Sequence, residues 1–191
     1  MATDHPLIAI DDALVARAIA LGDALRARGW RLATAESCTG GLVAGACTSP
    51  AGASDWFEAG FVTYGNAAKH ATLGVPTAMI ARHGAVSGEV AEAMARGALV
   101  AADVPLALSI TGIAGPGGGS ADKPVGTVWV GIAWRLERAA PEGLPAGGAE
   151  PAVAAWAQRL QLQGDRASIR AQTVVTALER LLLVARGEEL P

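Results

Sequence analysis

The chain has 191 residues, a length typical of one domain that can bury a sizeable core. Apolar residues make up 51% of the sequence and charged residues 17%, a composition that excludes a disordered chain. The formal net charge of -3 indicates no general affinity for nucleic acid. No apolar run approaches the ~20 residues that a membrane-spanning helix needs.

The cysteines and histidines are few and scattered. Cys38 and Cys47 cannot form a disulfide framework, and neither belongs to a pair with metal-ligand spacing. The N-terminus lacks the basic region and the long apolar stretch of an export signal. We therefore expect one cytoplasmic α/β domain over residues 1–191 that needs no metal and no cofactor. No metal-like cluster is expected from the three histidines, His5, His70 and His83.

The first half of the chain alternates between helical and strand-like patterns. Apolar residues at helical spacing predict an amphipathic helix over 11–29, and a short strand is expected at 30–35. A turn at 36–39 then leads into a helix of small residues. Strand-to-helix turns of this kind are where α/β folds present chemistry. The remaining expected elements are the small-residue helix 40–47, a strand at 56–64 and a helical piece that carries Lys69 and ends near 74–76.

The sequence of the second half of the chain predicts which strands lie at the centre of the sheet. Ser87 is suited to cap a helix running to about 102. The strands expected at 106–110 and 126–134 are apolar on both faces, so they should be central. The strand at 126–134 should be joined to an antiparallel strand at 153–162 by an exposed excursion at 137–151. A strong helix should follow over 165–186. The five tryptophans are expected in the core or at an interface: Trp30, Trp56, Trp129, Trp134 and Trp156.

The segment TAESCTGG, 34–41, places a hydroxyl at a turn that opens a helix. The first amides of a helix are unpaired donors with partial positive charge, so this arrangement suits a nucleophile beside an oxyanion pocket. The alternative is that Ser37 or Thr39 only caps the helix.

The segment YGNAAK, 64–69, supplies a candidate base. A serine hydroxyl does not attack an amide unaided, and no Ser, His and Asp are grouped as a triad, so Lys69 is the natural partner of Ser37. Lys69 must be desolvated to be neutral near pH 7. The alternative is an ordinary solvated lysine.

Two further segments are candidates for binding an anion. Successive amides in the glycine-rich stretch SITGIAGPGGG, 109–119, can form an anion-binding nest, to which Lys123 would add a charge. The stretch is not a Walker A loop, and a flexible connector is the alternative. Arg166 and Arg170 lie in the first turns of the last helix, where cations oppose the helix dipole. They favour a bound anion, with a solvated face or a salt bridge to Asp165 as alternatives.

Several long segments, taken in order, resemble the CinA C-terminal domain family, which includes nicotinamide-mononucleotide amidase. They are TAESCTGGLVA, SPAGASDWFEAGFVTYGNAAK, GVP, RHGAVSGEVAEAMARGA, SITGIAGPGGG, KPVGTVWVGIA and GDRASIR. The resemblance implies a three-layer α/β/α sandwich with a mixed, mostly parallel sheet. It also implies hydrolysis of nicotinamide mononucleotide to nicotinate mononucleotide and ammonia, by a stand-alone enzyme that forms a homodimer.

The resemblance also assigns roles to residues. Ser37 matches the nucleophile, Lys69 matches the base, and Tyr64 would assist proton movement. The expected substrate-binding residues are Thr39, Gly40 and Gly41, with their oxyanion-binding amides, and Asn66, Thr111, Gly112, Gly115, Lys123, Arg166 and Arg170. Relatives often have YSNEAK and GPDGG where this chain has Gly65, Ala67 and Gly117. These departures affect substrate detail more than the chemistry at Ser37 and Lys69.

Two other functions compete with the amidase. A non-catalytic nucleotide-binding or regulatory domain would keep the same fold, and it would release no ammonia from nicotinamide mononucleotide. A cysteine hydrolase would use Cys38, although no histidine is clearly placed to activate it.

Overall fold

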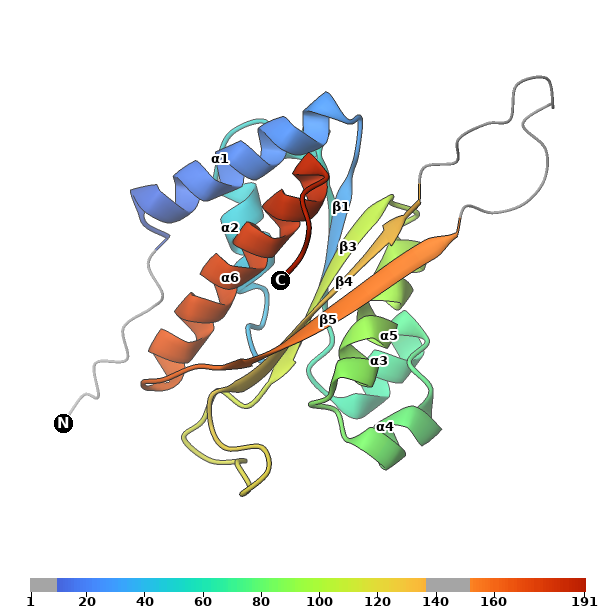
Figure 1. The fold of residues 1–191 in the computed structure, drawn as a ribbon, viewed down its shortest axis with the longest axis vertical. Helices are drawn as coiled ribbons and strands as arrows, with labels where there is room; N and C mark the ends of the chain where they lie inside the picture. The colour runs from blue at the N-terminus through green and yellow to red at the C-terminus, as the bar shows by residue number, and fades with distance from the viewer. Residues whose placement is uncertain (1–9, 137–151) are drawn as a thin grey trace.

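Five strands form one sheet in the order β2-β1-β3-β4-β5 (Figure 1). The structure is a computed structural model that describes residues 10–136 and 152–191. β1 pairs in parallel with β2 and β3, whereas β4 runs antiparallel to both β3 and β5. All strands except β4 therefore point the same way, as expected for a mixed, mostly parallel sheet. The strands are β1 (Leu32–Glu36), β2 (Phe57–Val62), β3 (Leu106–Gly112), β4 (Thr127–Arg135) and β5 (Val153–Gln161).

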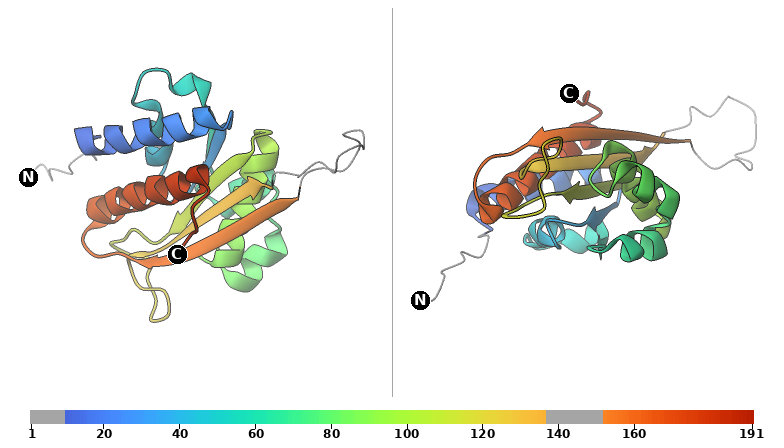
Figure 2. Two further views of the ribbon diagram at one scale, coloured as in Figure 1. Left: turned by 45° about the horizontal axis from the view of Figure 1, so that its top comes forward. Right: turned by 90° about the horizontal axis from the view of Figure 1, so that it is seen from below.

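Helices cover both faces of this sheet, which confirms the predicted three layers (Figures 1 and 2). One face carries α1 (Asp12–Ala27), α2 (Leu42–Thr48) and α6 (Arg166–Arg186). The other face carries α3 (Asn66–Leu73), α4 (Thr77–His83) and α5 (Gly88–Ala101), and a short 3-10 helix, η1 (Ala53–Asp55), precedes β2. None of the helices in the described residues is long and apolar enough to cross a membrane.

Local capping explains where the three longest helices begin. The Asp11 carboxylate accepts a hydrogen bond of 2.8 Å from the Leu14 amide. Ser87 accepts one of 3.3 Å from the Val90 amide, and Asp165 accepts one of 2.8 Å from the Ser168 amide. Each such cap typically stabilises a helix by about 1 kcal/mol. The predicted starts near 11, 87 and 165 are confirmed.

Two apolar layers fill the space between the sheet and its helices. On the side of α1 and α6, residues such as Leu21 and Ile132 are fully buried, and Trp56 joins them at 1% exposed. On the side of α5, Met94 and Ala107 belong to a second buried cluster. The last helix, predicted over 165–186, packs on the side of α1 through buried residues that include Ile169, Val174, Leu178 and Leu181.

The structure differs from the sequence prediction in one helix. α4 was not predicted, because Gly74 and Pro76 indicated the end of a helical segment. In the structure Gly74 does end α3, with a positive φ of 67°, while Pro76 with φ of -61° directly precedes α4. A proline restricts φ to values that suit the start of a helix. The excursion predicted at 137–151 and the N-terminal prediction that includes His5 lie outside the described residues.

The parallel strands place the candidate residues together. β1, β2 and β3 end at the same edge of the sheet, where Ser37 follows β1, Thr63 follows β2 and Thr111 lies near the end of β3. The last helix begins at this edge too, since β5 runs in the same direction as β3. Segments far apart in the sequence thus converge on one site.

Candidate active site

Ser37 occupies a tight turn between β1 and α2. Its amide donates to the Ile110 carbonyl of β3 at 3.0 Å, which holds the turn against the centre of the sheet. Gly40 and Gly41 then adopt positive φ values of 60° and 96°, a conformation that side-chain-bearing residues rarely adopt. The two glycines therefore allow the chain to turn sharply enough that Ser37 faces the edge of the sheet.

Lys69 reaches Ser37 from the other helical layer. It lies in the second turn of α3 and is only 1% exposed. Its Nζ atom is 3.1 Å from the Oγ atom of Ser37, 2.7 Å from the Thr63 carbonyl oxygen and 3.2 Å from the Tyr64 carbonyl oxygen. The alternative of a solvated surface lysine is therefore excluded.

The surroundings of Lys69 favour a neutral amine. Burial lowers the pKa of Lys69 below its ordinary value, and the nearby Cys38 thiol opposes this shift to a smaller extent. A neutral amine has two N–H groups and one lone pair. The Thr63 and Tyr64 carbonyls can accept the two hydrogens, which leaves the lone pair directed at the Ser37 hydroxyl. This arrangement can remove the proton of a serine.

Cys38 lies beside the pair but is poorly suited to act as a nucleophile. Burial raises the pKa of its thiol to about 11, with smaller opposing effects from a hydrogen bond with its own main-chain amide and from Arg166 and Arg170. A thiol with such a pKa is protonated at neutral pH, and the thiolate is the reactive form. Among the described residues, no histidine lines the cavity that contains Cys38. The geometry supports Ser37 over Cys38.

A cavity of about 280 Å³ opens in front of Ser37 and Lys69. Its size is just below the range of roughly 300–1,000 Å³ that is usual for small-molecule sites. β3, the glycine-rich stretch after it and the start of α6 form the remaining walls. The predicted site residues that line it are Ser37, Tyr64, Asn66, Lys69, Thr111, Gly112, Gly115 and Arg166.

Arg166 bridges two walls of the cavity. Its guanidinium donates to the Gly115 carbonyl at 2.9 Å and to the Tyr64 hydroxyl at 3.2 Å. Tyr64 is 61% exposed, so its hydroxyl lies at the solvent side of the cavity. Thr111 also lines the cavity, and its hydroxyl donates to the Ala85 carbonyl at 2.8 Å.

Other predicted site residues lie outside the cavity lining. The Gly40 amide donates to the Ser37 carbonyl, and the Gly41 amide donates to the Glu36 carboxylate. Thr39 is fully buried, and its carbonyl accepts a hydrogen bond of 2.9 Å from Arg170. The Nζ atom of Lys123 donates to the His83 carbonyl at 2.9 Å. Of the three expected cations, only Arg166 lines the cavity.

Sequence reasoning missed two contributions to the site. Ala85 and Val86, between α4 and α5, line the cavity, but small apolar residues in a connector carry no chemical signal. Glu36 is 1% exposed and accepts from amides at the start of α2. The signal for Glu36 was a carboxylate at the end of a short strand, directly before the candidate nucleophile.

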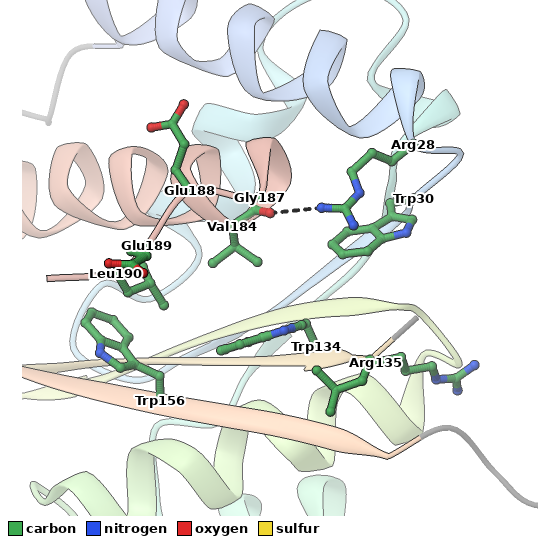
Figure 3. Close-up of a pocket in the computed structure, with 11 residues that line it drawn as sticks. Arg28, Trp30, Trp134, Arg135, Trp156, Val184, Gly187, Glu188, Glu189 and Leu190 are labelled. Atoms are coloured by element: carbon green, nitrogen blue, oxygen red, sulfur yellow. Dashed lines mark hydrogen bonds between the residues drawn. The ribbon is translucent and has the colours of Figure 1, made fainter. Parts of the chain in front are cut away.

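A larger cavity of about 500 Å³ lies at the opposite end of α6 (Figure 3). Trp134 and Trp156 form its sheet side, and Trp30 stands across from them beneath the Arg28 guanidinium, which lies 3.6 Å from the centre of the indole ring. Its described lining contains the carboxylates of Glu188 and Glu189 but no hydroxyl, thiol, lysine or histidine that they could activate for attack on an amide. The chemistry is therefore at the smaller cavity.

The described residues contain no cluster of three or more His, Cys, Asp or Glu side chains arranged to hold a metal ion. The reactive groups at the small cavity are a hydroxyl, an amine, a guanidinium and main-chain amides. These groups suit nucleophilic attack and the binding of an anion.

Known proteins are similar to this chain over most of its length. The chain is 47% identical to the nicotinamide-nucleotide amidohydrolase PncC of Enterobacter agglomerans over 86% of this chain and 90% of that protein. It is 48% identical to the PncC of Escherichia coli K12, over 84% of this chain and 88% of that protein. The crystal structure of the competence/damage inducible protein CihA from Agrobacterium tumefaciens superposes with a TM-score of 0.80 at 38% identity, over 95% of this chain and 100% of that chain.

The family profile described as the CinA C-terminal domain matches residues 15–184, which include the whole candidate site. The resemblance noted in the sequence is thereby confirmed. This chain belongs to the CinA C-terminal domain family.

Proposed function

We propose that this chain is an amidohydrolase that converts nicotinamide mononucleotide to nicotinate mononucleotide and ammonia. The observation that carries the proposal is the buried contact of 3.1 Å between Lys69 Nζ and Ser37 Oγ at the wall of a ligand-sized cavity. The relatives named nicotinamide-nucleotide amidohydrolase, which match most of the chain, support the choice of substrate.

In the first half of the reaction, Ser37 attacks the carboxamide carbon of the nicotinamide ring. Lys69 takes the hydroxyl proton as the new C–O bond forms. The tetrahedral intermediate then breaks its C–N bond, and the proton held by Lys69 passes to the leaving nitrogen, so that ammonia departs. The product of this half is an ester between Ser37 and the nicotinate group. A water molecule, activated by the same amine, hydrolyses the ester and restores Ser37.

The amide of Cys38 is the best candidate to bind the oxyanion of the intermediate, with that of Thr39, which lies outside the cavity lining, behind it. Within the described residues, neither amide donates to a protein oxygen, whereas those of Ser37, Gly40 and Gly41 do. Cys38 directly follows the nucleophile and lines the cavity. A well-placed donor of this kind typically contributes about 3 kcal/mol to transition-state stabilisation.

The phosphate of the substrate is assigned to Arg166 and the glycine-rich stretch. In the described part of the chain, the amides of Ala114, Gly117 and Gly118 have no protein acceptor, and all three residues line the cavity. Together with the Arg166 guanidinium they form a positively polarised wall across from Ser37. Lys123 would contribute its charge from behind this wall. Arg170 would act from behind the nucleophile turn, the turn between β1 and α2 that carries Ser37. Tyr64 would assist proton transfer near the solvent. We also expect a cytoplasmic homodimer.

The direct test is ammonia release by the purified protein. Nicotinamide mononucleotide, nicotinamide riboside and nicotinamide should be compared at equal concentrations, with the Ser37→Ala protein as the blank. We expect rapid release from the mononucleotide and much slower release from the other two. A folded protein that binds the mononucleotide but releases no ammonia would instead be a regulatory domain. Light scattering of the same sample tests the homodimer.

A further inference from the structure

Glu36 is a buried carboxylate that the mechanism above does not use. It is the last residue of β1, it directly precedes Ser37, and it is 1% exposed. Burying a carboxylate is costly unless hydrogen bonds replace the water that it loses. Its partners therefore indicate what it does.

The Glu36 carboxylate binds the first amides of α2. One oxygen accepts hydrogen bonds from the Gly41 amide at 2.9 Å and the Val43 amide at 3.1 Å, and the other accepts from the Ala44 amide at 2.8 Å. The N-cap of α2 is Gly41, which has no side chain to satisfy these donors. Glu36 thus caps the helix from five residues upstream, where a negative charge also interacts favourably with the helix dipole.

The main chain of Glu36 connects the same turn to the base. Its carbonyl accepts from the Thr63 amide at 2.9 Å, and the Thr63 carbonyl accepts from Lys69 Nζ at 2.7 Å. Lys69 Nζ in turn contacts Ser37 Oγ at 3.1 Å. These contacts close a ring through Glu36, Thr63, Lys69 and Ser37. The side chain of Glu36 lies outside this ring and holds the other end of the same turn, at the start of α2.

We propose that Glu36 is a positioning residue, which rests on the function proposed above. By holding the start of α2, its carboxylate fixes the turn between β1 and α2 so that Ser37 Oγ faces Lys69. By occupying the amides of Gly41, Val43 and Ala44, it also leaves the Cys38 amide as the donor nearest the nucleophile. In the described part of the chain, the Glu36 carboxylate bonds to Thr34 and to the amides of α2 and its N-cap and not to Lys69, so it acts through geometry and not through the charge of the base.

The test compares Glu36→Gln with a matched cap variant elsewhere. Glutamine keeps the size of the side chain, but its NH2 group is a donor and cannot accept the hydrogen bonds that the carboxylate receives from the main-chain amides. We expect kcat to fall about 100-fold, as for a displacement of reacting atoms by about 1 Å. KM should stay within about twofold, and the midpoint of the pH profile of kcat/KM should stay at the wild-type value. Asp11→Ala removes the cap of α1 and should lower the melting temperature while leaving kcat unchanged.

Three results would overturn the proposal. If Glu36→Gln has the same kcat as Asp11→Ala, the carboxylate is a helix cap and nothing more. A raised KM with normal kcat would make Glu36 a substrate-binding determinant. A moved pH midpoint would mean that its charge tunes Lys69. Absence of ammonia release by the wild-type protein would contradict the proposed function instead.

Amide hydrogen exchange of the wild-type protein, followed by NMR, gives a second measurement if the glutamine variant does not fold. We expect slow exchange at Gly41, Val43 and Ala44 and fast exchange at Cys38. Equally fast exchange at all four amides would show that the carboxylate does not hold this turn, and the proposal would be wrong.

Discussion

The Nζ atom of Lys69 lies 3.1 Å from the Oγ atom of Ser37, although the two residues are 32 positions apart and belong to opposite helical layers. Ser37 directly follows β1 and Lys69 belongs to the helix that follows β2, so the contact exists because β1 and β2 are parallel neighbours. The pair therefore depends on the pairing of β1 with β2. Its chemistry can be separated from its structural role by substitution.

Replacing Ser37 with alanine should abolish turnover while leaving the fold and the binding of the mononucleotide largely intact. The hydroxyl supplies the covalent step and makes one side-chain hydrogen bond in the described structure, to Lys69. The measurements are steady-state ammonia release and binding by calorimetry. Cys38→Ala keeps the main-chain amide and removes only the thiol, so most of the turnover should remain. A folded but inactive Cys38→Ala protein would favour the cysteine hydrolase.

The identity of the base can be tested through the pH dependence of kcat/KM. Lys69 must be neutral to accept a proton, and burial lowers its pKa from the ordinary value of 10.5. We expect kcat/KM to rise with pH through a single ionisation below that value. Lys69→Arg should be nearly inactive, because a guanidinium keeps its proton at every accessible pH. Rapid acylation by Lys69→Arg in a single-turnover assay would mean that Lys69 serves only as a charge.

Arg166 should recognise the phosphate and not the amide. Arg166→Ala should reduce kcat/KM for nicotinamide mononucleotide by about 10- to 100-fold, the loss expected for one charge-assisted hydrogen-bonded contact. The slow reaction of nicotinamide riboside, which lacks the phosphate, should change much less. Arg17→Ala, which removes an exposed ion pair with Glu179 and a hydrogen bond to the Ala13 carbonyl, is the matched control. Equal losses on both substrates would place Arg166 at the reacting carboxamide or at Tyr64 instead.

The elements were predictable from sequence where the local signals were strong. Three helix starts could be predicted because a capping side chain accepts a hydrogen bond from an amide only three residues away. The caps are Asp11, Ser87 and Asp165. The apolar strands at 106–110 and 126–134 indicated the centre of the sheet because both of their faces are buried. These features depend on short stretches of chain, and the prediction of each is confirmed.

The rest depends on contacts between distant residues. Glu36 resembles a chance carboxylate in a strand until the turn after it brings the amides of α2 back onto it. Arg166 and Lys123 look alike as candidate cations, and only the fold decides that Arg166 lines the cavity while Lys123 binds the His83 carbonyl. Sequence spacing does not encode such choices. The roles of the site residues stay predictions that substitutions must test.

Gly97 should tolerate no side chain, because α5 and α3 meet there. A Cβ atom on Gly97 would collide with the main-chain carbonyl of Leu73, at the end of the helix that carries Lys69. Gly97→Ala should lower the free energy of unfolding by about 1–3 kcal/mol, the usual effect of overpacking, despite the better helix propensity of alanine. Urea denaturation measures this loss. Val100→Ala, at a position of α5 that is 72% exposed, should change stability little.

The buried amine of Lys69 should also make the stability of the protein depend on pH. Its pKa is lowered in the folded state, so the unfolded chain binds this proton more tightly than the folded chain does. Between the folded pKa and the unfolded value of about 10.4, the unfolded state therefore carries more protons, and the free energy of unfolding rises with pH. Below the folded pKa, the protein bears the full cost of keeping a buried ammonium.

Lys69→Met keeps the length of most of the side chain and removes the ionisation. We therefore expect the variant to be the more stable protein at low pH, and its free energy of unfolding should not rise with pH in this way. The measurement is urea denaturation of both proteins at a series of pH values from neutral to alkaline, and parallel curves for the two proteins would show that the pKa of Lys69 is not lowered by folding.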